Sequence, residues 1–210
     1  MFSRAINPGL SPFWDGAPVP RIAIVDPQPA VRAGLTVLLQ REPGLRPAGA
    51  AATAAEAVEL AERTRPDIVL LDHRLPDGDG LRLCRRLRTL PGAPRVVLYS
   101  ADPEPSLHIL ARVAGADGLV DKTAPPETLY DALRVVGRGG SALPPVTHAQ
   151  LQEAAHRVEA DDLALLAMLV DRTAPADVAD ALRLDRRGLA GRTERLLGRL
   201  RRRGSPAPAA

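Results

Sequence analysis

The stretch PDIVLLDHRLPDGDGL, residues 66–81, decides the fold of this 210-residue chain. Its apolar run IVLL (68–71) has the length and composition of a strand buried on both faces, which is typical of parallel sheets covered by helices. Asp72 ends the run, and a segment rich in proline and glycine follows it. Ligand sites in such sheets form at the carboxyl ends of the strands. The stretch therefore predicts an α/β domain with a polar site at the end of a buried strand.

Strand-like and helix-like patterns alternate on both sides of this stretch. Further strands are predicted at residues 21–25, 46–53, 95–100 and 118–120. Helical spacing of apolar residues predicts helices at about 31–39, 54–65, 81–90, 106–114 and 127–136. Pro47 cannot donate to a central ladder, so the strand at 46–53 is expected at a sheet edge. Alternation of this kind predicts an α/β doubly wound, five-stranded parallel sheet.

Four polar residues come at or just after the ends of these strands. Asp26, Asp72 and Ser100 end three strands, and Lys122 follows the last one. A carboxylate flanked by a hydroxyl and an ammonium can attack a phosphoryl group, because the hydroxyl and the cation hold its equatorial oxygens. Lys122 is also the single lysine of the chain. A compact ammonium fits a small pocket that a planar guanidinium does not.

Residues 21–137 resemble the receiver domain of response regulators, which has a flavodoxin-like fold. The fragments that carry the resemblance are IVDPQPAVRAGL (24–35), PDIVLLDHRLPDGDGL (66–81), VVLYSA (96–101) and AGADGLVDK (114–122). The resemblance implies that Asp72 is the phosphoacceptor and that Lys122 and Ser100 pair with the phosphoryl oxygens. It also implies Mg²⁺ as cofactor, held by Asp26, Asp72 and the main-chain carbonyl of Arg74.

Two positions depart from the receiver pattern. The family carries a second acid, its direct metal ligand, at the position of Pro27, and proline offers no side-chain oxygen to Mg²⁺. We therefore expect weak Mg²⁺ binding and slow or absent phosphorylation. Leu119 replaces the aromatic residue whose rotamer reports phosphorylation in the family, which puts that signal route in doubt. A pseudo-receiver, with Lys122 simply paired to Asp72, is the alternative to a working switch.

The segment GRGGSALPP (137–145) ends the alternating pattern, and only helices are expected after it, near 162–170, 176–182 and 186–201. The sequence ADVADALRLDRRGLAGRTERLLGRL (176–200) resembles the LuxR-type helix-turn-helix of NarL/LuxR-type regulators. The resemblance implies a recognition helix in the DNA major groove. The arginines expected to contact DNA are Arg186, Arg187, Arg192 and Arg195. Ala190 and Glu194 replace basic residues of the family, so altered base readout is expected.

These observations predict a small all-α helix-turn-helix domain after the receiver. The expected organisation is a disordered tail (1–20), a receiver (21–137), a linker (138–158), the helix-turn-helix domain (159–203) and a second disordered tail (204–210). No apolar run is long enough to cross a bilayer, and one cysteine excludes an intrachain disulfide, so a cytoplasmic protein is expected.

The predicted function is a DNA-binding transcriptional regulator of two-component type. Its expected partners are DNA, a sensor histidine kinase and a second copy of the chain. The alternative is a pseudo-receiver that serves as an interaction or dimerisation module without phosphorylation or DNA binding. A phosphatase with Asp72 as nucleophile would need an acid two residues later for proton transfer, where this chain has Arg74. No enzymatic activity is therefore expected.

Overall fold

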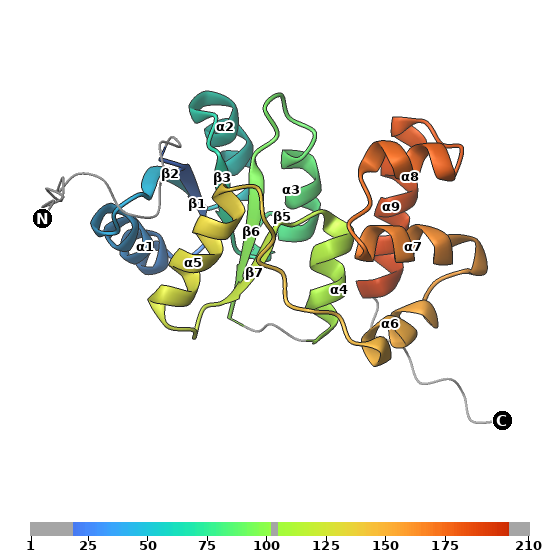
Figure 1. Ribbon diagram of the computed structural model, residues 1–210. Helices are drawn as coiled ribbons and strands as arrows, with labels where there is room; N and C mark the ends of the chain where they lie inside the picture. The colour runs from blue at the N-terminus through green and yellow to red at the C-terminus, as the bar shows by residue number, and fades with distance from the viewer. Residues whose placement is uncertain (1–18, 102–104, 202–210) are drawn as a thin grey trace, which may run out of the picture.

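The computed structural model describes residues 19–101 and 105–201 (Figure 1). The tails expected at 1–20 and 204–210 lie outside this part of the chain, apart from Val19 and Pro20.

Five parallel strands form the central sheet in the order β2-β1-β3-β6-β7. They are β1 (Arg21–Val25), β2 (Arg46–Ala51), β3 (Ile68–Leu71), β6 (Arg95–Ser100) and β7 (Gly118–Asp121). The α/β doubly wound sheet is confirmed, with β2, which contains Pro47, at an edge. A short antiparallel pair not expected from the sequence, β4 (Arg74–Leu75) and β5 (Gly78–Asp79), follows the central strand β3.

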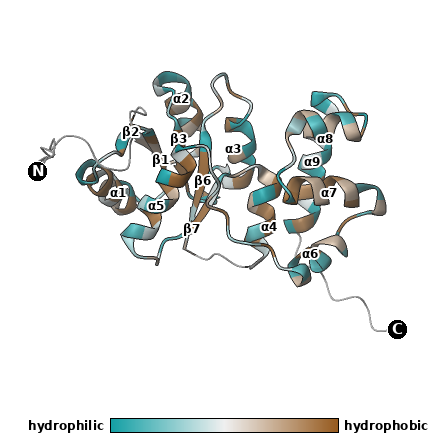
Figure 2. Ribbon diagram, viewed as in Figure 1, coloured by the Kyte–Doolittle hydropathy of each residue, from teal (hydrophilic) through white to brown (hydrophobic). Residues whose placement is uncertain are grey.

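Helices cover both faces of the sheet because the apolar residues of each strand point alternately to either side. On one face, Ile22, Ile24 and Leu70 pack against α1 (Pro29–Arg41) and α5 (Pro126–Gly137). Ala23 and Leu71 belong to the other face, which is covered by α2 (Ala54–Thr64), α3 (Gly80–Leu87) and α4 (Pro105–Ala114). Figure 2 shows the hydrophobic colouring of β6 between these two layers.

The part of the chain after α5 is helical, as expected. Its helices are α6 (His148–Ala155), the short 3-10 helix η1 (Ala160–Asp162), α7 (Leu163–Val170), α8 (Pro175–Ala181) and α9 (Arg186–Arg201). Between α8 and α9 the chain turns through Arg183, whose φ of 52° lies in the left-handed region. α9 forms despite its three glycines, and the Asp185 carboxylate caps its first turn by accepting from Gly188 N at 2.6 Å. No helix in the described ranges is both long and apolar enough to span a membrane.

The segment 138–158, expected to be a linker, contains α6. Thr147 and Gln150 form a reciprocal capping box at its start, which satisfies two backbone donors. Only Ala154 of α6 is buried, so the helix has almost no apolar periodicity to reveal it. The Thr-x-x-Gln spacing is the sequence signal that identifies its first turn.

The two folded parts share one hydrophobic cluster along α4. Leu107 and Leu110 of α4 belong to the same buried cluster as Leu166 of α7 and Leu197 and Leu200 of α9. Figure 1 shows α4 lying between the sheet and the C-terminal helices. The C-terminal helices therefore pack directly on the α/β domain through α4.

Candidate functional site

The parallel sheet brings Asp26 and Asp72 together at one rim. Asp26 follows β1 and Asp72 follows β3, its neighbour in the sheet. Asp72 N donates to Val25 O at 2.8 Å, which fixes the backbone of both sites relative to each other. Asp26 is 1% exposed and Asp72 is 7% exposed. Two carboxylates buried this deeply require a compensating positive charge.

Lys122 supplies that charge to both carboxylates. Its Nζ lies 2.6 Å from Oδ2 of Asp72 and also donates to Oδ2 of Asp26. Burial alone would lower the pKa of Lys122, but its hydrogen bonds to the two carboxylates, together with their charges, raise it above the ordinary lysine value. The ammonium is therefore held in its charged form between the two acids.

The remaining oxygens of the two carboxylates are occupied by local backbone donors. Oδ1 of Asp26 accepts from Gln28 N at 2.8 Å, and Oδ1 of Asp72 accepts from Arg74 N at 3.0 Å. Nδ1 of His73 lies 3.6 Å from that same Asp72 oxygen. Each carboxylate is thus engaged at both of its oxygens.

Ser100, fully buried at the end of β6, is adjacent to this pair. Its backbone oxygen accepts from Lys122 N at 2.8 Å. The rim expected from the sequence therefore exists, with Asp26, Asp72, Ser100 and Lys122 gathered at the carboxyl ends of four strands. Leu119, which replaces the aromatic residue of the receiver pattern, is buried on β7.

The donor set of this rim does not fit a tight Mg²⁺ site. Mg²⁺ requires near-octahedral oxygen ligands. Here Pro27 offers no side-chain oxygen, and Oδ2 of both Asp26 and Asp72 is already bound to the Lys122 ammonium. Among the described residues, no group of three His, Cys, Asp or Glu side chains could hold a metal ion.

A second candidate site is the basic surface of α9. Arg186, Arg187 and Arg195 are exposed. Arg192 is instead half-buried, and its Nε lies 2.6 Å from Oδ1 of Asp162, so its guanidinium is paired with a carboxylate of the same domain. Three of the four arginines expected to contact DNA therefore reach the surface, and one is paired internally.

Residues that sequence reasoning did not select tie α9 to α3. Oε1 of Glu194 lies 2.6 Å from Nε of Arg82, and Oε2 lies 3.4 Å from Nε of Arg85. Arg85 also donates to Ala190 O at 2.9 Å. From the sequence, Glu194 is recognisable only as an acid at a position where the family has a basic residue. Its partners lie in the other domain, more than 100 residues away in the sequence.

The end of α9 reaches the neighbourhood of Asp72. Arg201 is paired with Asp79, which caps the start of α3 by accepting from Leu81 N at 3.1 Å. Gly80, next to Asp79, lies so close to the strand that a Cβ there would be 2.4 Å from Asp72 O. A groove of about 610 Å³ separates the two domains here and is lined by residues that include His73, Arg74, Leu110, Arg157 and Arg201.

Comparison with known proteins agrees with this architecture. Residues 22–134 match the family model of the response regulator receiver domain. The chain is 31% identical over 190 residues to the DNA-binding transcriptional activator DevR/DosR of Mycobacterium tuberculosis, a match that covers 86% of this chain and 88% of that protein. It is 36% identical, with a TM-score of 0.57, to the crystal structure of a LuxR-family two-component response regulator from Aurantimonas, over 67% of this chain and 99% of that one.

A longer structural match shows that the fold extends beyond the receiver. The structure of RcsB from Salmonella enterica bound to the promoter P1flhDC has a TM-score of 0.58 and 15% identity, and the match covers 87% of this chain and 92% of that one. At this identity the likeness concerns the fold alone. With the receiver match and the full-length relative, it leads to one conclusion: the chain belongs to the response regulators of the NarL/LuxR type, with a receiver domain followed by a helix-turn-helix domain.

Proposed function

We propose that this chain is a DNA-binding transcriptional regulator whose receiver domain controls its helix-turn-helix domain. The observation that carries the proposal is the exposed basic surface of α9, with Arg186, Arg187 and Arg195 on the second helix of a helix-turn-helix. Arginine pairs with phosphates and reads guanine bidentately in the major groove. The full-length relative from Mycobacterium tuberculosis is itself described as a DNA-binding transcriptional activator.

The packing between the domains supports control by the receiver. Ala190 and Glu194 lie on the side of α9 that contacts α3, so this side of the helix is covered by the receiver. Related LuxR-type helices carry basic residues at these two positions, so we infer that this side of α9 faces the major groove when DNA is bound. We infer that the described arrangement binds DNA weakly and that separation of α9 from α3 strengthens binding.

The rim around Asp72 is the part through which the receiver would be regulated. We assign Asp72 as the phosphoacceptor position, with Lys122 and Ser100 as the residues that would pair with the phosphoryl oxygens and a histidine kinase as the donor. Because Pro27 supplies no side-chain oxygen to Mg²⁺, we expect weak Mg²⁺ binding and slow phosphorylation. Arg74 offers no acid for proton transfer, which supports a regulator rather than a phosphatase.

DNA binding is tested by fluorescence anisotropy with the region upstream of the protein's own gene, at low and moderate salt. The expected result is salt-dependent binding whose affinity falls at least tenfold in Arg186→Ala/Arg187→Ala, because the variant loses two phosphate contacts. The dependence of its affinity on salt should also be weaker. Arg63→Ala is the matched control, since Arg63 is an exposed arginine on α2, away from α9. Absence of binding at low salt, or an equal loss in the control, would overturn the proposal.

A homodimer is the proposed DNA-bound form. Two copies would place two recognition helices on half-sites about one helical turn apart. Sedimentation of the full chain with and without a DNA fragment measures this directly. A stable dimer that fails to bind DNA would instead favour the interaction module without DNA binding.

A further inference from the structure

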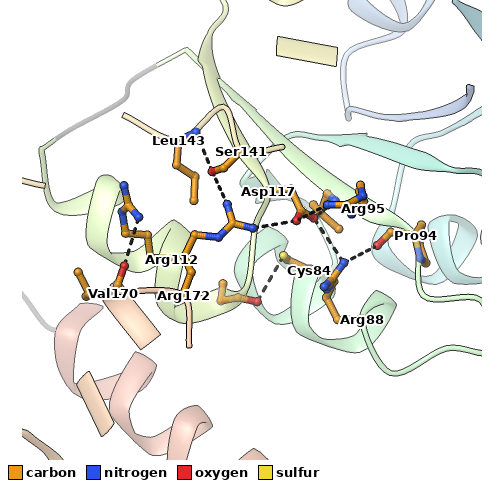
Figure 3. A network of polar contacts seen from close by, with 12 residues as sticks. Cys84, Arg88, Pro94, Arg95, Arg112, Asp117, Ser141, Leu143, Val170 and Arg172 are labelled. Carbon is orange, nitrogen blue, oxygen red and sulfur yellow. Dashed lines mark hydrogen bonds and ion pairs between the residues drawn. The ribbon is translucent and has the colours of Figure 1, made fainter. Parts of the chain in front are cut away.

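Three arginines converge on one buried carboxylate, Asp117, at the junction of the two domains (Figure 3). The Asp117 side chain is 2% exposed, and Oδ2 accepts from Val96 N at 3.0 Å. Arg88 Nη1 lies 3.4 Å from Oδ2, while Arg95 Nη1 at 3.3 Å and Arg172 Nη2 at 3.1 Å contact Oδ1. We call Arg88, Arg95, Arg172 and Asp117 the Asp117 cluster.

The Asp117 cluster contains more positive charge than negative charge. Asp117 is the one carboxylate in the described chain that pairs with Arg88, Arg95 or Arg172, so two guanidinium charges are left over. Arg112 lies at the same junction, where burial and then the charge of Arg172 lower its pKa and the charge of Asp171 raises it.

The cluster also has unused donor capacity on partly exposed side chains. A guanidinium offers five N–H donors in a planar fork. The contacts of Arg95 within the described chain use only Nη1, and those of Arg88 use only Nη1, shared between Asp117 and Pro94 O at 3.3 Å. The three arginine side chains are between 33% and 38% exposed, whereas the carboxylate that orients them is buried. Oriented, partly exposed guanidinium groups are suited to bidentate recognition of phosphate-type oxyanions.

We propose that the Asp117 cluster binds a phosphate-type oxyanion, either free or as the terminal phosphate of a small molecule. This site is separate from the rim of Asp72, because Asp117 precedes β7 and therefore lies at the opposite end of the sheet. The cluster takes its arginines from both domains. Arg88 and Arg95 come from the receiver, and Arg172, which also contacts Ser141 after α5, comes from the left-handed turn after α7. A bound oxyanion therefore holds the helix-turn-helix domain against the receiver.

Titration calorimetry of the full chain with inorganic phosphate and with adenosine monophosphate, at constant ionic strength, tests the site. The expected result is saturable binding of one anion per chain that weakens at least tenfold in Arg95→Gln. Within the described chain Arg95 makes no hydrogen bond or ion pair with the C-terminal domain, so this variant removes a donor without removing a polar link between the domains. Tighter binding of the nucleotide than of phosphate identifies a phosphate monoester as the ligand, and the reverse identifies the free ion.

Arg63→Gln is the matched control, because Arg63 is an exposed arginine of α2 that lies outside both the cluster and the DNA-binding surface of α9. It keeps full affinity if the site is the Asp117 cluster. Circular dichroism of each variant verifies the fold. Absence of saturable heat with either anion, or unchanged affinity in folded Arg95→Gln, would overturn the proposal. Neither result depends on DNA binding, so the site and the proposed function fail independently.

Discussion

Glu194 of α9 lies 2.6 Å from Nε of Arg82 on α3, which joins the proposed recognition helix to the receiver. The resemblance to LuxR-type helices implies a basic residue at this position. An acid there repels DNA phosphates and attracts the arginines of α3. The same side chain therefore disfavours DNA and favours the packed arrangement of the two domains.

Glu194→Gln is expected to loosen this packing. The side chains of Arg82 and Glu194 are 66% and 38% exposed, so the pair contributes no more than about 1 kcal/mol. We expect DNA affinity to rise by about two- to fivefold in anisotropy measurements, because a free energy of about 1 kcal/mol corresponds to about a fivefold change in affinity. The double variant Arg82→Gln/Arg85→Gln removes both receiver partners of Glu194 and should raise affinity in the same way. An effect in Glu194→Gln alone would show that the glutamate acts by repelling DNA and not by joining the domains.

The strands and the rim could be predicted because their signals are local. Buried parallel strands are continuous apolar runs such as residues 68–71, and the carboxyl ends of neighbouring parallel strands meet at one edge. Asp26, Asp72 and Lys122 were therefore placed together from sequences almost 100 residues apart.

Contacts between the domains could not be predicted in this way. The pairs Glu194–Arg82 and Arg172–Asp117 depend on how two folded units pack, and no periodicity encodes that packing. Arg192 was expected on the DNA-facing side, but Asp162, 30 residues earlier, binds its guanidinium. Helical spacing alone does not reveal a partner from another helix.

Pro27→Asp is expected to improve the rim as a metal site. Pro27 is half-buried beside Asp26, and an aspartate there supplies the carboxylate oxygen that the rim lacks. We expect Mg²⁺ affinity, measured by calorimetry, to rise about tenfold or more, on the order of 1.4 kcal/mol. Mass spectrometry after incubation with acetyl phosphate and Mg²⁺ should show faster labelling of Asp72 than in the unmodified chain.

Pro27→Ala is the control for that variant, because it removes the proline ring without supplying an oxygen. It should leave both Mg²⁺ affinity and labelling unchanged. Rapid, stoichiometric labelling of Asp72 in the unmodified chain would show that Pro27 does not limit the reaction.

Lys122→Met is expected to destabilise the receiver. The Lys122 side chain is 12% exposed, and its removal leaves Asp26 and Asp72 buried without their cation. Loss of one partner from a buried pair costs about 3–5 kcal/mol. Urea unfolding of the full chain measures the change. Adding Asp26→Asn to Lys122→Met should recover part of the loss, and a double variant as unstable as the single one would contradict the electrostatic explanation.

The thiol of Cys84 should make stability fall at alkaline pH. Burial raises the pKa of Cys84 from 9.0 to about 12, so the folded chain keeps a proton that the unfolded chain loses. A folded pKa above the unfolded value gives a contribution that is complete below about pH 9 and is lost as pH rises toward 12. Between pH 9 and pH 10.5 this amounts to about 2 kcal/mol of the free energy of unfolding.

Cys84→Ala isolates this contribution, because it removes the titrating group from both states. Its stability at pH 7.5 should be lower, since the substitution leaves a small cavity beside Ala114, whose carbonyl oxygen lies 3.5 Å from Sγ. Lys122 and Tyr99 also have raised pKa values, so they add their own alkaline losses in both proteins. The difference in pH dependence between the two proteins therefore belongs to the thiol. Parallel stability curves from pH 7.5 to 10.5 would show that Cys84 titrates alike in both states.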